Sequence, residues 1–285
     1  MKKVLQIEHK LIFTQVVLLL IITITGLLSY RLGHDYVVTN PYGDLVRLFG
    51  YGIYARDSYF KAPIFIGSDL AMLIIVVPLL LWATFGDLKK STLRRRVTLI
   101  ALVGVVVYYA TSIAFGITYN ALMLAYIALF STSLFTLFVL IFRTDLSQLT
   151  VRRVKGLDPF LVVTGVALFG IWLMDIIPTW LNGSSLPLIE TYTTEITYVL
   201  DMGLISPLIF VGLYLRKKHN ALGELITIAM LTLCVIVGLM LPVQTGVQLM
   251  AGIEIPVPVL VIKVGIFVVL ALIAAVYDGL LLRQR

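Results

Sequence analysis

The sequence predicts an all-α fold, a polytopic transmembrane bundle of about eight helices, and three observations lead to it. Hydrophobic residues make up 60% of the 285 residues and charged residues only 13%, and the mean hydropathy is +1.03. Long apolar stretches recur along the whole chain. Short clusters of Lys and Arg separate these stretches. A water-soluble fold has too little interior to bury this much apolar surface.

Eight stretches meet the length that a spanning helix needs, roughly 20 mostly apolar residues. They are 11–30, 64–85, 97–116, 121–142, 159–180, 191–215, 221–243 and 257–282. They leave almost no chain for a soluble domain, so we expect residues 1–285 to form a single transmembrane domain. The first stretch is too long for the apolar core of a signal peptide and no small-residue cleavage site follows it, so we expect a retained helix.

The basic residues predict the orientation. With the N-terminus inside, every cytoplasmic segment carries two or more Lys or Arg residues, whereas the outer segments carry only Arg31, Arg47, Arg56 and Lys61. Cytoplasmic loops of membrane proteins are enriched in these residues. We therefore predict that both termini are cytoplasmic. The net charge of +7 comes from the same loop clusters, so it does not indicate a nucleic-acid partner.

The longest outer segment, residues 31–63, is rich in tyrosine and glycine. This composition predicts a segment at the outer interface, either an ordered cap or a short amphipathic helix, although an ordinary interfacial aromatic belt has the same composition. The single cysteine, Cys234, lies in an apolar stretch. An intrachain disulfide and a cysteine metal site are therefore excluded.

The second and sixth stretches share a pattern that suggests an internal repeat. Asp69 is followed by Pro78, and Asp201 by Pro207, and each stretch then ends at a basic cluster. Both stretches are expected to run from outside to inside. We therefore predict two parallel four-helix halves, residues 1–150 and 151–285, related by an axis along the membrane normal. The spacing from Asp to Pro differs between the two stretches.

Three parts of the sequence resemble an uncharacterised family of bacterial eight-helix membrane proteins. These parts are Asp69-Leu with Pro78-Leu-Leu-Leu, Tyr108-Tyr109 with Tyr119-Asn120 and Tyr126-Ile-Ala-Leu-Phe-Ser, and Val199-Leu-Asp201 with Pro207, Arg216-Lys-Lys and Leu222-Gly223. The resemblance covers most of the second to fourth stretches and the sixth. It implies a multi-pass protein of the bacterial cytoplasmic (inner) membrane, and it brings no known activity.

Ionisable residues within the stretches are few, and they gather toward the outer side. At a rise of about 1.5 Å per residue, Asp69 and Asp201 lie roughly 10 Å below the outer surface. Lys263 reaches a similar depth and Asp175 a shallower one, while the inner halves hold almost nothing comparable. Such residues are costly in a bilayer and typically functional. We therefore predict an outward-facing, ligand-binding polar pocket lined by Asp69, Asp201, Lys263, Asp175, Tyr109, Asn120 and Tyr126.

Two interpretations of this cluster remain open. Lys263 with Asp201 or Asp69 would form a buried ion pair that fixes helix register, which is a purely structural role. However, three carboxylates would face one ammonium. The excess negative charge favours a protonated carboxyl, a bound cation or a cationic substrate group.

The sequence carries no established catalytic pattern. It has no Gly-rich phosphate loop, no His-Glu-x-x-His and no Gly-x-Ser-x-Gly motif, and its three histidines are expected at opposite ends of the bundle. We therefore predict no metal, no cofactor and no catalytic residue. An aspartyl dyad of Asp175 and Asp201 would lack the Gly-x-Gly-Asp context of intramembrane proteases.

Three functions remain open. The first is a permease or carrier-like protein that binds a small polar or cationic solute, or a proton, in the outward-facing pocket. The second is a non-transporting sensor or assembly subunit, although the inner segments are too short for an output domain. The third is a membrane-embedded enzyme that acts on lipid. The predicted partners are the lipid bilayer and a small-molecule or cation ligand, and the sequence leaves the oligomeric state open.

Overall fold

The computed structural model of the chain confirms the all-α bundle of eight spans. It describes residues 6–186 and 188–283, without the side chains at positions 259 and 263. Within this part, eight helices are long and apolar enough to cross a membrane. They are Ile7–Leu28, Ala62–Lys89, Leu93–Gly116, Met123–Arg143, Leu157–Asn182, Ile196–Lys217, Ala221–Met250 and Leu260–Arg283. The chain is a multi-pass membrane protein.

Some spans are divided into shorter elements. The α-helices are α1 (Ile7–Leu28), α2 (Ala62–Ala71), α3 (Val77–Lys89), α4 (Leu93–Gly116), α5 (Met123–Arg143), α6 (Leu157–Asn182), α7 (Ile196–Leu200), α8 (Ser206–Lys217), α9 (Ala221–Met250), α10 (Val257–Val259) and α11 (Ile266–Arg283). The π-helical turns are η2 (Met72–Val76), η4 (Asp201–Ile205) and η5 (Leu260–Gly265). Short 3-10 turns are η1 (Gly52–Tyr54) and η3 (Leu146–Gln148).

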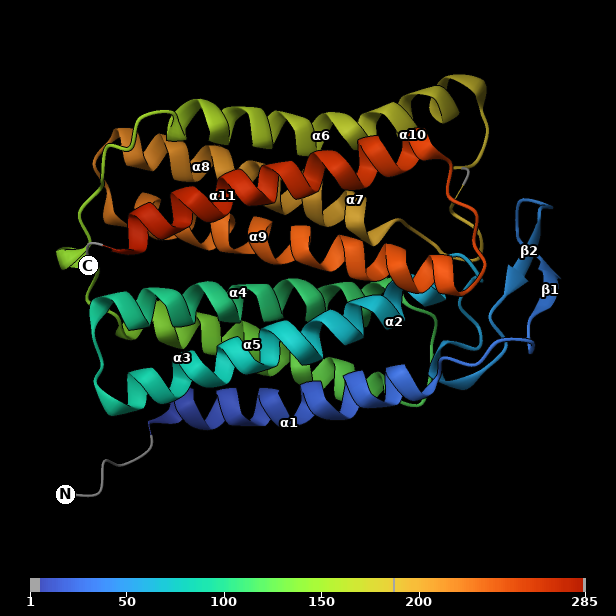
Figure 1. Ribbon diagram of the computed structural model, residues 1–285, viewed down its shortest axis with the longest axis horizontal. Coiled ribbons are helices and arrows are strands. Elements are labelled where there is room, and N and C mark those ends of the chain that lie inside the picture. Colours follow the sequence, from blue (N-terminus) through green and yellow to red (C-terminus); the bar gives the residue numbers. More distant parts are fainter. Residues whose placement is uncertain (1–5, 187, 284–285) are drawn as a thin grey trace.

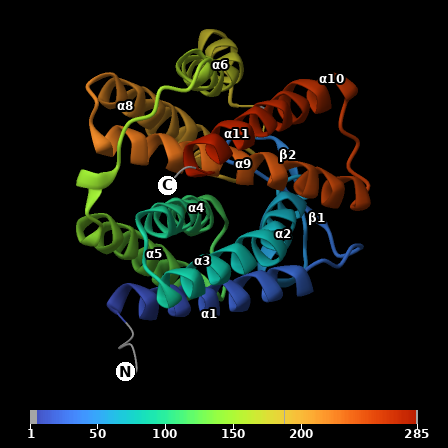
Figure 2. The same cartoon turned by 60° about the vertical axis from the view of Figure 1, so that its left-hand side comes forward.

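The helices form two groups that lie against each other (Figures 1 and 2). In the first group α1 packs on α2 and α5, and α4 packs on α3 and α5; in the second, α8 packs on α6 and α9, and α9 packs on α11. The groups meet where α9 contacts α2 and α4, and where α7 contacts α4. The repeat of residues 1–150 and 151–285 stays a prediction.

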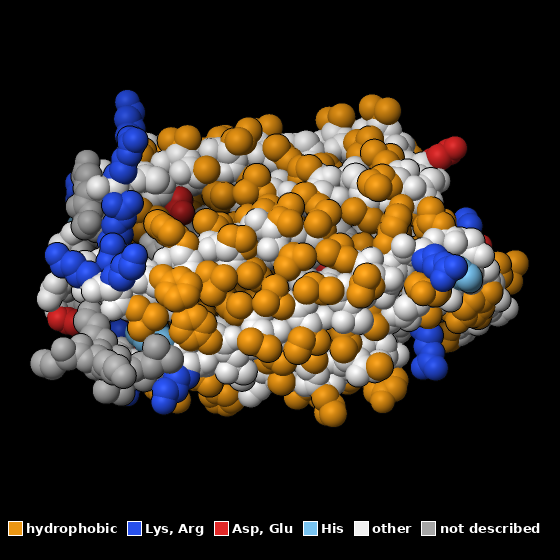
Figure 3. Space-filling view, turned by 60° about the horizontal axis from the view of Figure 1, so that its bottom comes forward, with side chains coloured by type: hydrophobic (Ala, Val, Ile, Leu, Met, Phe, Trp, Pro, Cys, Tyr) orange, Lys and Arg blue, Asp and Glu red, His pale blue; other side chains and the backbone are white. Residues whose placement is uncertain are grey.

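The two ends of the bundle differ in character. The start of α1 and the end of α11 lie at the same end, and a β-hairpin projects from the opposite end (Figure 1). A wide surface of hydrophobic side chains separates the ends, and Lys and Arg gather mainly at the end with the termini (Figure 3). Following the predicted orientation, we call the hairpin end outer and the other end inner.

The outer segment 31–63 is built around this hairpin. Strands β1 (Tyr36–Thr39) and β2 (Leu45–Leu48) pair antiparallel, with Tyr36 opposite Leu48 and Thr39 opposite Leu45. At the turn, the Asn40 side-chain oxygen accepts hydrogen bonds from the backbone N–H of Tyr42 and Asp44, which is the usual role of Asn in a turn. The segment is therefore an ordered cap with strands and a 3-10 turn, and not the short amphipathic helix that the sequence left open.

Two of the spans that contain a proline have a π-helical turn directly before that proline. Pro78 follows η2 and Pro207 follows η4, each in the first turn of the next α-helix. Proline lacks the N–H that would continue the helical ladder, and its ring clashes with the carbonyl four residues earlier, so a change of winding at this point relieves the strain. Pro178 of α6 and Pro242 of α9 instead lie inside continuous α-helices. Asp69 lies just before η2 and Asp201 begins η4. Each aspartate therefore sits where its helix departs from regular geometry.

Candidate functional site

Asp69 is buried in the first helix group, bound by two tyrosines. Its side chain is fully buried. The Tyr54 hydroxyl, from η1, donates to Oδ2 at 2.7 Å, and the Tyr109 hydroxyl, from α4, donates to Oδ1. Gly26 of α1 packs on the same carboxyl, so closely that a Cβ there would overlap Oδ2. This contact requires glycine, because only a residue without a side chain lets α1 approach the aspartate.

Asp201 is held in a parallel manner by groups from α4 and α6. It is 6% exposed. The Tyr108 hydroxyl donates to Oδ1 at 3.0 Å, and the Trp172 indole N–H donates to Oδ2 at 3.0 Å. Tyr108 and Tyr109 are consecutive on α4 and serve different carboxyls. One dipeptide thus connects the aspartates of the two helix groups.

Neither aspartate has a cationic partner in the part of the chain that the structure describes. The ion pairs of that part involve other acids, and the donors to Asp69 and Asp201 are neutral. An ionised carboxylate that is buried without a compensating charge is strongly disfavoured. The predicted pairing with Lys263 concerns a side chain that lies outside the described residues, so it stays a prediction.

Of the remaining predicted site residues, Asp175 lies apart, whereas Asn120 and Tyr126 are neighbours. Asp175, on α6, accepts a hydrogen bond from the Tyr198 hydroxyl at 2.7 Å. Asn120 belongs to a turn, where its side-chain oxygen accepts from the Leu122 N–H at 2.9 Å. Tyr126 is fully buried, and its hydroxyl lies near the Asn120 side chain and the Asp69 carboxyl.

The second aspartate cluster extends from Asp201 toward Asp175. Trp172, which binds Asp201, stacks on the Tyr198 ring with centroids 4.4 Å apart, and Tyr198 binds Asp175. The first cluster contains Asp69, Tyr109 and their other partner Tyr54. The residues predicted to line one pocket thus contribute to two buried polar clusters and a surface turn.

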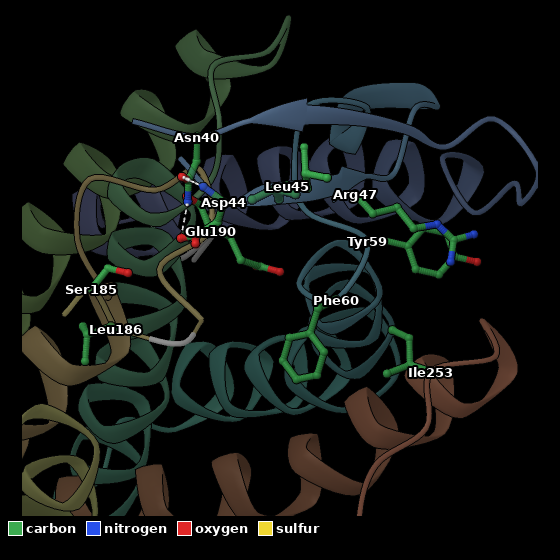
Figure 4. A pocket seen from close by; sticks show the side chains of 11 residues that line it. Asn40, Asp44, Leu45, Arg47, Tyr59, Phe60, Ser185, Leu186, Glu190 and Ile253 are labelled. Atoms are coloured by element: carbon green, nitrogen blue, oxygen red, sulfur yellow. Dashed lines mark hydrogen bonds between the residues drawn. The ribbon is translucent and has the colours of Figure 1, made fainter. Parts of the chain in front are cut away.

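A cavity of about 460 Å³ lies farther out, between the hairpin and the segment before α7 (Figure 4). Asn40, Asp44 and Glu190 gather on one side, and Arg47 and Tyr59 lie on the other. None of the seven residues predicted from the sequence lines it. The outward-facing cavity therefore comes from loop residues, above the buried aspartates.

The outer cavity carries excess negative charge. The Arg47 guanidinium donates to Asp35 at 2.7 Å and stacks over the Tyr59 ring at 3.7 Å, so its charge is largely balanced. The same hydrogen bond holds the pKa of the Asp35 carboxyl below its usual value. Asp44 and Glu190 remain, and they are joined through Asn40, whose side-chain amide donates to Asp44 at 3.2 Å and to the Glu190 carbonyl at 2.9 Å.

Glu190 is the strained residue of this cavity. Its φ of +49° is in the left-handed region, which costs free energy for a residue other than glycine and often marks a functional position. Its Oε2 is buried and has no hydrogen-bond partner in the described chain, and burial raises the pKa of the carboxyl. The backbone strain thus holds a desolvated carboxyl beside the cavity.

The carboxyl of Asp57 links its own outer loop to two others through hydrogen bonds. It is fully buried, and its Oδ1 accepts from the Tyr192 hydroxyl at 3.0 Å and the Thr118 backbone N–H at 2.9 Å. Oδ2 has no partner within the described residues. Burial raises the pKa of this carboxyl to about 7. Lys61 forms an ion pair with Glu195 and lies over the Tyr192 ring at 4.1 Å.

The inner end contains an ion network that the sequence did not predict. Glu8 is fully buried and accepts from Arg96 at 2.8 Å and from Arg143 at 2.9 Å. His9 Nε2 lies 2.9 Å from Asp87, which also pairs with Arg96 at 3.1 Å. These residues lie just beyond the inner ends of the predicted spans, so the prediction of almost nothing comparable in the inner halves did not extend to them. Positive-inside reasoning accounts for the arginines, but the acids of α1 and α3 that face them went unnoticed.

Tyr54, Tyr108 and Trp172 were also missed, although they donate directly to the buried aspartates. Buried tyrosine and tryptophan normally need a partner for their polar atom, and Tyr108 and Trp172 lie within predicted spans. The sequence could therefore have indicated that Tyr108 and Trp172 need a polar partner. Tyr54 lies in an outer loop, where the sequence gives no such indication.

Comparisons with protein-family models, curated proteins and solved structures find no significant match. The resemblance to a bacterial family therefore stays a prediction. In the described chain, no group of three or more His, Cys, Asp or Glu side chains is arranged to hold a metal ion. The arrangement instead offers isolated carboxyls with neutral donors, which can take up a proton or face a monovalent cation.

Proposed function

We propose that this membrane protein is a permease-like carrier that binds a proton, or a small cationic solute, at carboxyls in its outer half. The observation that supports this most is the pair Asp69 and Asp201. Each is buried at membrane depth, each has two neutral donors, and neither has a cationic partner among the described residues.

The cost of burying a negative charge favours binding of a proton or a cation at these carboxyls. Ionised groups in a membrane core cost several kcal/mol unless they are paired or hydrated. Protonation removes this cost, and so does an incoming cation. A tyrosine hydroxyl can donate to a carboxylate and remains a neighbour of the protonated acid, so the same cage accommodates both charge states. Membrane carriers commonly use such carboxyls as proton relays.

We propose that the proton or cation enters through the outer cavity on its way to the buried aspartates. Asp44 and Glu190 supply excess negative charge beside the Phe60 ring, a combination that attracts a small organic cation through charge and a cation–π contact. The Tyr59 ring already carries the Arg47 guanidinium. Tyr54 binds Asp69 and lies on the same loop as the buried Asp57. The proposed route would follow this loop, which carries a second buried carboxyl.

The first test measures proton binding directly. Infrared difference spectra of reconstituted protein, recorded as the pH is stepped, report the C=O stretch of protonated carboxyls. We expect bands that disappear in Asp69→Asn and Asp201→Asn. Asp145→Asn is the matched control, because Asp145 is an exposed acid of η3 at the inner end. Bands that are the same in all three variants would contradict the proposal.

The second test measures flux. Liposomes that hold the protein and an internal pH-sensitive dye are exposed to methylammonium, choline or sodium across an imposed pH gradient. We expect proton flux that depends on one of these cations and is lost in the two site variants but retained in Asp145→Asn. A site that binds protons without any flux would instead favour the sensor or assembly role.

A further inference from the structure

A basic cavity lies at the inner end, between the beginning of α6 and the end of α8. Its volume is about 600 Å³, and it is lined by residues 151–156 and the first turn of α6 on one side and by the last residues of α8 on the other. The cationic side chains in the lining include Arg152, Arg153, Lys155 and Lys217, with His219 beside them and Asp158 as the one acid in the lining. This cavity is remote from both aspartate clusters and the outer cavity.

The walls of the cavity are fixed by buried contacts. Arg216 is only 5% exposed; it forms an ion pair with the buried Glu224 of α9 and donates to the Arg152 backbone carbonyl at 2.7 Å. Gly156 adopts a φ of +84°, and a Cβ there would lie 2.6 Å from the Tyr277 hydroxyl of α11. The loop before α6 is thus held by α8 on one side and by α11 on the other.

The positive charge of Arg216 is balanced by an acid inside the protein, whereas other cations of the cavity lining lie at the surface. Arg153, Lys155 and Lys217 are exposed, and they form no ion pair with any described residue. Several cations around one cavity repel one another. An anion with several acceptor oxygens offsets this repulsion and can accept hydrogen bonds from more than one of them.

The position of the cavity identifies the source of that anion. It lies where two spans reach the inner end, α6 beginning at Leu157 and α8 ending at Lys217, which is the level of lipid headgroups. Tyr214, one turn earlier on α8, is 60% exposed and offers an apolar surface below the charges. Basic pockets between transmembrane helices on this side of a membrane suit anionic lipid headgroups. We propose that this cavity binds the phosphate group of an anionic phospholipid.

The test compares lipid affinities of the full chain in neutral detergent, measured by native mass spectrometry with phosphatidylglycerol, phosphatidylcholine and inorganic phosphate. We expect phosphatidylglycerol to bind best. The variant Lys155→Gln/Lys217→Gln should lose roughly 25-fold in affinity, since each lysine near an anionic headgroup contributes about fivefold. The control Lys10→Gln/Lys90→Gln removes the same charge from two exposed lysines outside the cavity and should lose about twofold or less.

Each alternative outcome has a clear meaning. Equal losses in the two double variants would show that only total charge matters, and the proposed site would be wrong. Inorganic phosphate that binds as tightly as phosphatidylglycerol would contradict a lipid ligand. Equal binding of phosphatidylcholine would contradict an anion site. Should the double variant fail to fold, Lys217→Gln against Lys90→Gln gives the same comparison with single exposed lysines inside and outside the cavity.

Discussion

The buried carboxyl of Asp57 should make the outer loops less stable as the pH rises. Burial raises its pKa from the usual 3.8 to about 7, so the folded loops bind its proton more tightly than the opened loops do. The stabilisation is therefore complete below about pH 4, and it is lost as the pH rises through about 7. Asp57→Asn should remove this dependence, because the amide stays neutral and keeps an oxygen that accepts from Tyr192 and Thr118.

The size of the effect follows from the two pKa values. The interval from 3.8 to about 7 corresponds to about 4 kcal/mol over the whole pH range, at about 1.4 kcal/mol for each pH unit. Between about pH 5 and pH 8 the expected loss is about 3 kcal/mol, which is roughly a hundredfold change in the opening equilibrium.

Hydrogen exchange followed by mass spectrometry measures this opening loop by loop. After correction for the intrinsic exchange rate, protection of peptides from residues 49–61, 117–122 and 183–195 should fall about a hundredfold between about pH 5 and pH 8 in the wild-type protein. In Asp57→Asn it should stay nearly constant. Protection that rises with pH, or that falls equally in both proteins, would refute the assignment to this carboxyl.

Four further predictions concern the bundle itself. Gly26→Ala should lower the free energy of unfolding by about 1–3 kcal/mol, because the added methyl overlaps Asp69; denaturant titration in detergent measures the loss. Tyr109→Phe removes only the hydroxyl that binds the same carboxyl and should cost about 1–3 kcal/mol in that titration, whereas an unchanged midpoint would refute the bond. Arg216→Gln leaves the buried Glu224 without its partner and should cost about 3–5 kcal/mol, and a smaller loss at low pH would identify the uncompensated carboxylate as the cause. A reporter that is active only outside the membrane should be silent when it is fused to the C-terminus, and strong activity there would overturn the predicted orientation.

The eight spans could be predicted from the sequence because bilayer thickness sets a minimum length and each stretch meets it locally. The boundaries differ at several outer ends. The seventh helix continues past Pro242 to Met250, for example, because neighbouring helices can satisfy the groups that a proline leaves unpaired. The hairpin of residues 36–48 does carry a turn signal in Asn40-Pro41 and Gly43, but its strands are short and mix exposed apolar and charged residues, so they show no clear strand pattern.

The site was only partly predictable, because its geometry depends on contacts between distant segments. Asp69 and Asp201 were recognisable as isolated acids in apolar stretches. Their tyrosine and tryptophan donors, however, come from other helices or from an outer loop, and composition does not reveal such pairings. The outer cavity depends on Glu190 meeting Asn40 across a long stretch of chain. Contacts between segments so far apart in the sequence become visible only in the folded structure.

The consecutive tyrosines of α4 bind the two aspartates to a single rigid element. Neighbouring residues of an α-helix point about 100° apart, so a rotation of α4 about its axis moves both hydroxyls together while their acceptors stay on other helices. A movement of α4 as a rigid body therefore disturbs the hydrogen bonds of both aspartates at once, although the two aspartates belong to different spans.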